Sequence, residues 1–208
     1  EVFLTAYQTL FWVGQLQKGE RVLIHAGASG VGTAAIQLAK QAGAYVIATA
    51  GSAEKLEACR KYGADLAINY KKEAFDTVIE DHFGPAAIDV ILDFIGASYW
   101  EKNIKVIAVD GRHVLISTLG GAIVDSFHLG QLMAKRVTLT GTTLRSRSLD
   151  YKERLTDEFA IWALPLFNAK KITPVVDKIF PIEQVKAAHE YMEANKNIGK
   201  IILSLTDI

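Results

Sequence analysis

The sequence predicts a doubly wound α/β protein with a parallel, six-stranded sheet. Two observations lead to this expectation. Six short apolar or β-branched runs alternate with helical stretches that each carry an apolar stripe, and the first run leads directly into a glycine-rich turn. Strands that alternate with helices at this spacing pair in parallel and connect by right-handed crossovers.

The expected elements follow one another along the first 147 residues. Strands are expected at residues 21–25, 45–49, 65–68, 88–93, 113–117 and 137–140. Helices are expected at residues 30–42, 52–62, 71–82, 98–109 and 126–134, where apolar residues recur at helical spacing.

The pattern changes after about residue 147. Residues 149–168 are typical of one long helix, residues 172–180 of an extended stretch and residues 198–205 of a last strand. Pro181 is expected to open an amphipathic helix that runs to Asn195, because proline is favoured in the first helical turn. We therefore expect a sheet domain over residues 1–147 and a second part of helices and strands over residues 148–208.

Composition excludes several classes of protein. The 208 residues hold 23 Lys and Arg against 23 Asp and Glu, so no net charge favours a nucleic-acid partner. Cys59 is the one cysteine and the five histidines are scattered, so we expect neither a disulfide framework nor a metal site. The single cysteine favours a reducing compartment, and we expect a cytoplasmic location. No apolar run reaches 18 residues, so we expect neither a membrane span nor a signal peptide; a chain that begins with Glu1 suggests a fragment or a processed protein.

The glycine-rich turn is the strongest functional signal. The strand at 21–25 runs into residues 27–32, Gly-Ala-Ser-Gly-Val-Gly, and then into an apolar helix, which is the setting of a dinucleotide-binding turn in a Rossmann sheet. Ser29 stands where the usual pattern has its middle glycine. A pyrophosphate is expected at Ser29, Gly30, Val31 and Gly32, held by the N–H groups and dipole of the helix. The alternative is a tight turn that needs glycine for packing only.

The end of the second strand favours NADPH over NADH. An NAD site usually has an acidic residue there for the ribose 2′-hydroxyl, but the chain reads Thr-Ala-Gly-Ser at residues 49–52. Gly51, Ser52, Lys55 and Tyr70 are expected to surround a 2′-phosphate. The missing acid also argues against an S-adenosylmethionine methyltransferase. The alternatives are a solvated lysine at Lys55 and core packing at Tyr70.

Three later turns are expected to surround the nicotinamide, because open α/β sheets bind ligands at the carboxyl ends of their strands. They lie at residues 95–98, 117–121 and 141–144, and each could instead be an ordinary strand–helix turn. The residues expected to bind there are Gly96, Ser117, Thr118, Leu119, Gly120, Thr142 and Leu144. The charged run at residues 145–147 is either a solvated cluster or an anion contact.

Other catalytic patterns are missing from the sequence. No Tyr-x-x-x-Lys pair, G-x-S-x-G elbow or Walker loop occurs, which argues against a short-chain dehydrogenase, a serine hydrolase and a P-loop enzyme. His25 and His113 are expected to be hydrogen-bonded imidazoles of the core or its rim, and Cys59 a core residue. We assign no catalytic residue.

Six runs together resemble the zeta-crystallin-like quinone oxidoreductases of the medium-chain dehydrogenase/reductase superfamily, and the resemblance extends from Glu1 to Leu205. The runs are residues 5–7 (TAY), 25–39 (HAGASGVGTAAIQLA), 68–70 (INY), 96–103 (GASYWEKN), 144–147 (LRSR) and 191–200 (YMEANKNIGK).

The resemblance implies a zinc-independent reductase that passes a hydride from NADPH to quinones or other electron-poor enones. It places phosphates at residues 29–32, the 2′-phosphate near Gly51, Ser52, Lys55 and Tyr70, and the nicotinamide near residues 117–120 and 142–144. It also implies a homodimer that pairs through the edge strand near Val137 and Gly141.

Members of this family begin with a GroES-like catalytic domain to which nothing in this chain corresponds, and residues 148–208 resemble the segment that returns to it. Two other classes therefore stay open: a nucleotide-binding module or redox sensor without turnover, and a structural protein like the lens crystallins of the family.

Overall fold

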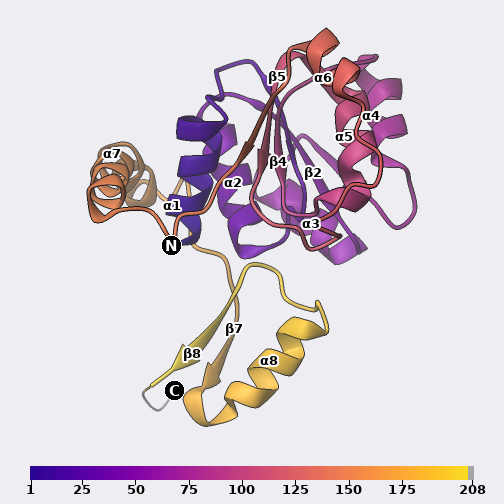
Figure 1. The fold of residues 1–208 in the computed structure, drawn as a ribbon. Coiled ribbons are helices and arrows are strands. Elements are labelled where there is room, and N and C mark those ends of the chain that lie inside the picture. The colour runs from indigo at the N-terminus through magenta and orange to yellow at the C-terminus, as the bar shows by residue number, and fades with distance from the viewer. Residues whose placement is uncertain (206–208) are drawn as a thin grey trace.

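The computed structural model describes residues 1–205 and contains a six-stranded parallel sheet and a separate two-stranded parallel sheet (Figure 1). The large sheet has the order β3-β2-β1-β4-β5-β6. Successive strands are therefore added on one side of β1 up to β3 and on the other side from β4 onward, which places the switch point between β1 and β4. Its strands are β1 (Arg21–Ile24), β2 (Tyr45–Ala50), β3 (Leu66–Asn69), β4 (Ile88–Asp93), β5 (Ile107–Leu115) and β6 (Thr138–Gly141). The predicted doubly wound fold is confirmed.

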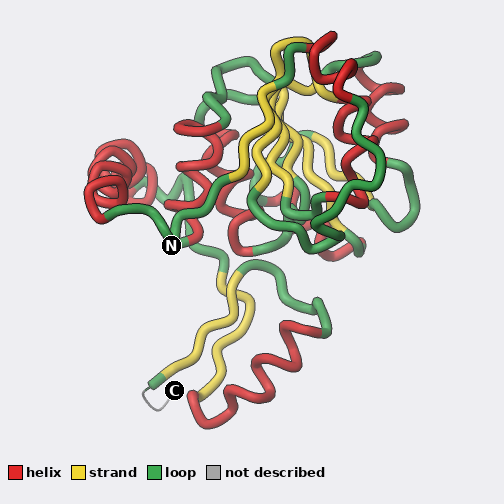
Figure 2. Tube along the Cα trace, viewed as in Figure 1, coloured by secondary structure: helices red, strands yellow, loops and turns green. Residues whose placement is uncertain are grey.

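Helices cover both faces of this sheet, which explains why its central strands are apolar on both sides (Figure 2). Val22 and Ile24 of β1 belong to the core on the side of α2 (Gly30–Gln41), α3 (Ala53–Lys61) and α1 (Val2–Tyr7). Leu23, between them, belongs to the core on the side of α4 (Phe75–Phe83) and α5 (Trp100–Val106). The two-residue period of a strand therefore divides neighbouring side chains between two cores.

The remaining helices extend these layers. A short 3-10 turn (Ala97–Tyr99) precedes α5, and α6 (Leu129–Lys135) precedes β6. A π-helical turn at Gln8–Val13 continues α1, and α7 (Leu149–Asn168) packs outside α1. Within residues 1–205, no helix combines the length and the apolar character that crossing a membrane requires.

Three predicted elements differ most from the structure. The predicted helix at 98–109 ends at Val106, and β5 begins at Ile107 rather than at residue 113, because Ile107 pairs with Ile88 of β4. Pro181 does not open a helix. It is the last residue of β7 (Val176–Pro181), and a 3-10 turn (Ile182–Gln184) separates it from α8 (Val185–Glu193).

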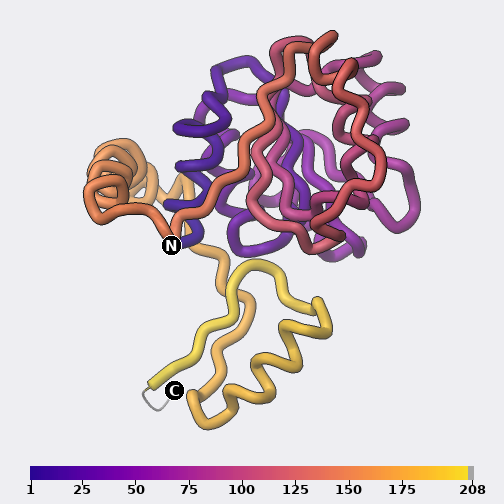
Figure 3. The backbone as a smooth tube through the Cα atoms, in the orientation of Figure 1, coloured from indigo at the N-terminus to yellow at the C-terminus, as the bar shows by residue number. Residues whose placement is uncertain are grey.

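The C-terminal lobe is formed by β7, α8 and β8 (Lys200–Ser204), and it stands apart from the large sheet (Figure 3). Its two strands pair only with each other, in parallel. The lobe meets the sheet domain where Gly199 forms an isolated parallel bridge with Ser29. Residues 206–208 of the predicted second part lie outside the described residues.

Candidate nucleotide-binding groove

The predicted binding residues gather at one edge of the large sheet, because parallel strands bring their carboxyl ends together. A cavity of about 330 Å³ is lined by Ser29, Gly30 and Val31 from the first turn and by Ser117 and Leu119 after β5. A neighbouring hollow of about 590 Å³ is lined by residues that follow β5 and β6. These residues are Leu115, Ile116, Ser117, Thr118, Gly141, Thr142, Thr143, Ser146 and Arg147. We refer to the cavity and this hollow together as the groove.

The first turn exposes the start of helix α2 toward this cavity. Ser29 is the N-cap, and its Oγ accepts a hydrogen bond from the Gly32 N–H at 3.0 Å. The Thr33 N–H is bound to the Ser29 carbonyl at 2.8 Å, so Gly30 and Val31 are the first-turn residues whose N–H groups lack an acceptor within the helix. A Cβ on Gly32 would lie 2.3 Å from the Ala26 carbonyl oxygen, which makes glycine necessary there. The turn therefore fits a pyrophosphate at Gly30 and Val31.

A second cluster forms at the end of β2, where the sequence lacks an acid. A Cβ on Gly51 would lie 2.7 Å from Tyr70 Oη and 3.2 Å from Lys71 Cε, so both side chains lie directly over the Gly51 backbone. Lys55 is near the same point: burial lowers the pKa of its ammonium, and the charge of Lys71 lowers it further, against Asp177, which raises it. Two ammonium groups that repel each other form a site that an anion would stabilise.

Lys71 was missed by the sequence prediction. It lies one position beyond Tyr70, after the end of β3, and the strand order places β3 beside β2. The lysine pair at residues 71 and 72 was visible in the sequence, but only the tertiary structure shows that Lys71 reaches Gly51.

Lys55 also binds the C-terminal lobe. Its Nζ donates to the carbonyl and to the side-chain Oδ1 of Asn195, at 2.8 and 2.7 Å. The Gly199 N–H donates to the Ala28 carbonyl at 2.8 Å, and the Lys200 side chain covers Gly30, since a Cβ there would lie 2.4 Å from Lys200 Cδ. The sequence analysis assigned no binding role to Asn195, Gly199 or Lys200. The structure brings all three next to predicted binding residues.

The end of the groove predicted for the nicotinamide consists of two interlocked turns. The Phe94 and Ile95 carbonyls accept from the N–H groups of Leu119 and Gly120, at 3.1 and 2.7 Å. Gly96 has a φ of +83°, and a Cβ there would lie 2.6 Å from the Gly121 carbonyl oxygen. Glycine is therefore required at residue 96 by both its backbone conformation and the close approach of the second turn.

The other residues predicted at this end have separate surroundings. Thr142 is buried, and its Oγ accepts from Gln8 Nε2 at 3.3 Å and from Arg147 Nη2 at 3.4 Å. Leu144 lines a different hollow, together with Leu4 and Leu155.

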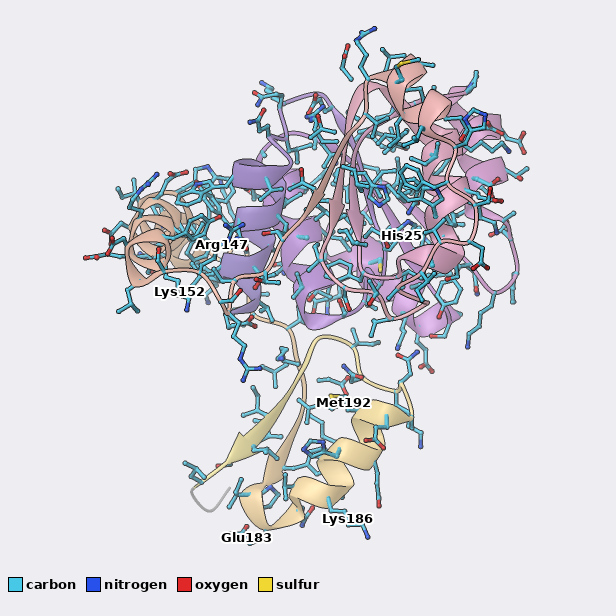
Figure 4. The ribbon with its side chains drawn as sticks, in the orientation of Figure 1. His25, Arg147, Lys152, Glu183, Lys186 and Met192 are labelled. Atoms are coloured by element: carbon cyan, nitrogen blue, oxygen red, sulfur yellow. The ribbon has the colours of Figure 1, made fainter. Side chains whose placement is uncertain are left out.

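A buried polar network lies beneath the groove and crosses four strands. His25 Nε2 donates to Asn103 Oδ1 at 2.8 Å, and His25 Nδ1 accepts from the Thr49 hydroxyl at 3.0 Å. Asn103 Nδ2 and His113 Nε2 both donate to Asp93 Oδ2, at 3.2 and 2.9 Å. Figure 4 shows His25 inside the sheet domain, among the strands.

Burial, hydrogen bonds and nearby charges together set the protonation states of His25 and Asp93. Burial lowers the pKa of His25 to about 4, although the nearby Asp93 carboxylate acts in the opposite direction, so His25 is neutral at pH 7. Burial alone would raise the pKa of Asp93, but the hydrogen bond from His113, the nearby His25 and the Gly96 N–H together hold it below its usual range. Asp93 is therefore a buried, charged carboxylate with its hydrogen bonds satisfied.

The interpretation of His25 and His113 as hydrogen-bonded core imidazoles is confirmed, since both are almost fully buried and bonded as described. Cys59 is also a core residue, and burial raises the pKa of its thiol to about 12. These groups do not form a zinc site: among residues 1–205 no cluster of three or more His, Cys, Asp or Glu side chains is arranged to hold a metal ion.

Comparison with known proteins gives a consistent family. The family model described as "Zinc-binding dehydrogenase" matches residues 30–160. Prostaglandin reductase-3 of Mus musculus is 30% identical over 97% of this chain, which corresponds to 56% of the mouse protein.

Solved structures agree with this result. The Escherichia coli quinone oxidoreductase complexed with NADPH superposes with a TM-score of 0.85 at 29% identity, covering 97% of this chain and 62% of that one. An NAD-dependent alcohol dehydrogenase superposes equally well, with a TM-score of 0.85 at 31% identity, covering 99% of this chain and 57% of that one. The chain thus spans little more than half the length of each of these three proteins.

Proposed function

Because this chain belongs to the zinc-binding dehydrogenase family, within the medium-chain dehydrogenase/reductase superfamily, we propose that it is the NADPH-binding part of a zinc-independent oxidoreductase. The substrates proposed for the whole protein are quinones or other electron-poor enones. Mouse prostaglandin reductase-3 and Escherichia coli quinone oxidoreductase are its relatives, and the second was solved with NADPH.

The cluster at the end of β2 carries the choice of cofactor. The family likeness alone does not decide it, because an NAD-dependent enzyme superposes as well as an NADPH complex does. Gly51 lies under Tyr70 and Lys71, Lys55 is close by, and no acid stands at residues 49–52 to accept from a 2′-hydroxyl. A 2′-phosphate would neutralise the repulsion between the two lysines.

When bound, NADPH supplies a hydride to the electron-poor carbon of the substrate. In this proposal Gly30 and Val31 hold the pyrophosphate, Gly51, Ser52, Lys55, Tyr70 and Lys71 hold the 2′-phosphate, and the turns at residues 117–120 and 142–144 orient the nicotinamide. Gly96 supports these turns by its packing against Gly121. We assign no proton donor, so the protein contributes position and exclusion of water rather than acid–base groups.

The cofactor is tested by titrating the purified chain with NADPH and NADH, read by calorimetry. Preference for NADPH supports the proposal, and preference for NADH contradicts the assignment at residues 49–55. In the whole protein, oxidation of NADPH is then followed by its absorbance with and without a quinone. Binding without quinone-dependent oxidation would favour the alternative, a nucleotide-binding module or redox sensor without turnover.

We further propose a homodimer through β6. This strand is at the edge of the large sheet, and Leu139 on it is 40% exposed. Leu129 and Met133 of the adjoining α6 are also exposed. Sedimentation at about twice the monomer mass of 22.8 kDa is expected, and a monomer at micromolar concentration would contradict the proposal.

The division at residue 147 and the cytoplasmic location are likewise proposals. The boundary is supported by the change from the large sheet to α7 and the C-terminal lobe, which we propose as the segment that returns to a catalytic domain. Limited proteolysis between β6 and α7 tests the boundary.

A further inference from the structure

Asp93 lies directly before the two interlocked turns at the nicotinamide end of the groove. It is the last residue of β4, is 1% exposed, and uses both carboxylate oxygens. Oδ1 accepts from the N–H groups of Ile95 and Gly96, at 2.7 and 3.0 Å. Oδ2 accepts from Asn103 and His113, so that one side chain connects the turn after β4 to α5 and β5.

The turn that Asp93 holds in turn holds the nicotinamide end of the proposed site. Phe94 and Ile95 accept the N–H groups of Leu119 and Gly120, and the Ala97 N–H donates to the Gly121 carbonyl at 2.9 Å. A Cβ on Gly120 would lie 2.6 Å from Ile95 Cγ2, so the two turns are in close contact. A displacement of Ile95 or Gly96 is therefore passed directly to residues 117–121.

The 2′-phosphate end is connected to Asp93 less directly. Tyr99, whose N–H donates to the Gly96 carbonyl at 2.9 Å, has its ring centroid 6.3 Å from that of Tyr70. Gly51, Tyr70, Lys71 and Lys55 belong to β2, β3 and α3, and the link from Asp93 to β2 passes through Asn103, His25 and Thr49. Asp93 bonds directly to the backbone of one turn of the groove and to none of the phosphate-end residues.

We propose that Asp93 is a positioning residue for the nicotinamide half of the bound cofactor, acting through the Ile95–Gly96 backbone on residues 117–120. This inference rests on the proposed function, because it assumes that NADPH occupies the groove. It adds a specific role for a buried carboxylate that touches neither cofactor nor substrate.

Asp93→Asn is the informative variant. The asparagine oxygen can still accept from Ile95 and Gly96, but its NH₂ group faces two donors, Asn103 Nδ2 and His113 Nε2. Without movement, Asn103 would have to flip its amide and His113 to take its other tautomer, which buries an Nδ1–H that has no partner. We therefore expect the side chain to rotate or shift and the turn to move with it. A matched control is Asp89→Asn on the same strand, since Asp89 accepts from the Arg21 N–H at 2.7 Å at the opposite end of the sheet.

The test compares two ligands on the 208-residue chain by calorimetry. NADPH probes the whole groove, whereas adenosine 2′,5′-bisphosphate carries the 2′-phosphate and no nicotinamide. Asp93→Asn is expected to weaken NADPH about tenfold and to leave the bisphosphate within about twofold of wild type. Asp89→Asn is expected to change neither affinity.

Two results would overturn the inference. Unchanged NADPH affinity in Asp93→Asn excludes a positioning role, and an equal loss for both ligands shows a general structural role. The proposed function itself fails if the wild-type chain binds neither ligand, or if it binds NADPH no more tightly than the bisphosphate. Either result is seen with the wild-type chain, before any variant is made.

A double variant keeps the test decisive if Asp93→Asn does not fold. In Asp93→Asn/Asn103→Asp the carboxylate at residue 103 can accept from His25 Nε2 and from the new asparagine, which removes the conflict at residue 103. His113 then takes its other tautomer, so that its Nε2 accepts the second N–H of the asparagine. NADPH affinity is expected to return to within about threefold of wild type.

Amide hydrogen exchange gives a second readout. The amides of Leu119 and Gly120 should exchange faster in Asp93→Asn and not in Asp89→Asn, and equal exchange in both variants would count against the inference.

Discussion

The two parallel sheets of this molecule differ sharply in burial. In the large sheet, β4 is buried at nearly every residue, whereas β7 in the C-terminal lobe is exposed at four of its six residues. The large sheet has helices on both faces, and the small one has α8 alone, with Ile179 and Leu203 left partly exposed. A parallel sheet is stable when both of its faces are covered. The sheet domain is therefore stabilised by its own core, whereas the lobe depends on contacts outside its own sheet and helix.

The lobe contacts the sheet domain through hydrogen bonds and through the aliphatic part of Lys200, which covers Gly30. The hydrogen bonds include those between Lys55 and Asn195 and the Gly199–Ala28 backbone bond. Figure 4 shows Met192 at the end of α8 nearer the sheet domain, with Glu183 and Lys186 at the far end. The part of the lobe that meets the groove is thus one loop and one helix end.

The sharpest test of this difference is the same substitution in both sheets. Ile91→Ala in β4 removes a fully buried side chain and should lower the free energy of unfolding by about 2–5 kcal/mol. Ile202→Ala in β8, where the side chain is 39% exposed, should cost less than about 1 kcal/mol. Urea denaturation measures both, and equal costs would show that the lobe is as well packed as the sheet.

Acid should weaken the sheet domain through His25. The pKa of His25 is about 4 in the folded chain and about 6.5 when unfolded, so below pH 6.5 the unfolded chain binds a proton that the folded chain does not. Stability therefore falls as the pH drops from 6.5 to 4, by up to about 3 kcal/mol. The lowered pKa of Asp93 adds a loss in the same direction at still lower pH.

The His25→Gln variant isolates this contribution. It should be less stable than wild type at pH 7, because it disturbs the Thr49–His25–Asn103 chain of hydrogen bonds. Its stability should change less between pH 6.5 and 4.5, as measured by urea denaturation at each pH. A variant with the full wild-type pH dependence would assign that dependence to other groups.

Recognition of the phosphate should belong to the sheet domain and not to the lobe. Lys71→Ala is expected to weaken NADPH by about fivefold, or about 1 kcal/mol, and to leave NADH unchanged, because only NADPH has the 2′-phosphate. Lys72→Ala is the control, since the side chains nearest to Gly51 are those of Tyr70 and Lys71. Calorimetry measures the affinity for each nucleotide. An equal loss of affinity for NADPH and NADH would show that Lys71 does not recognise the 2′-phosphate.

The smallest effect is expected where the two regions meet. Asn195→Ala removes the side-chain acceptor of Lys55 and leaves the carbonyl acceptor, so global stability should change by less than about 0.5 kcal/mol. The β7–β8 amides should nevertheless exchange several-fold faster, because the lobe loses a contact with the sheet domain. Unchanged exchange would show that the lobe does not depend on this contact.

Much of the fold could be predicted from the sequence because the signals are local. Strand–helix alternation, the turn at residues 27–32 and the long helix Leu149–Asn168 each follow from spacing within a short window. The start of β5 was missed because residues 107–112 include Asp110 and Gly111, and their strand conformation comes from pairing with β4. Pro181 was misplaced because a proline that fits a first helical turn fits the end of an edge strand equally well.

The candidate site divides in the same way. The sequence by itself determined the fold class, the glycine-rich turn at residues 27–32 and the missing acid at residues 49–52, because glycine and charge requirements are properties of individual positions. Only the tertiary structure decided that Lys71 covers Gly51, that Asn195 and Lys200 meet the first turn, and that Asp93 joins His113, Asn103 and the Ile95–Gly96 turn. These contacts connect residues far apart in the chain, and their geometry depends on strand order and on side-chain packing that no local pattern encodes.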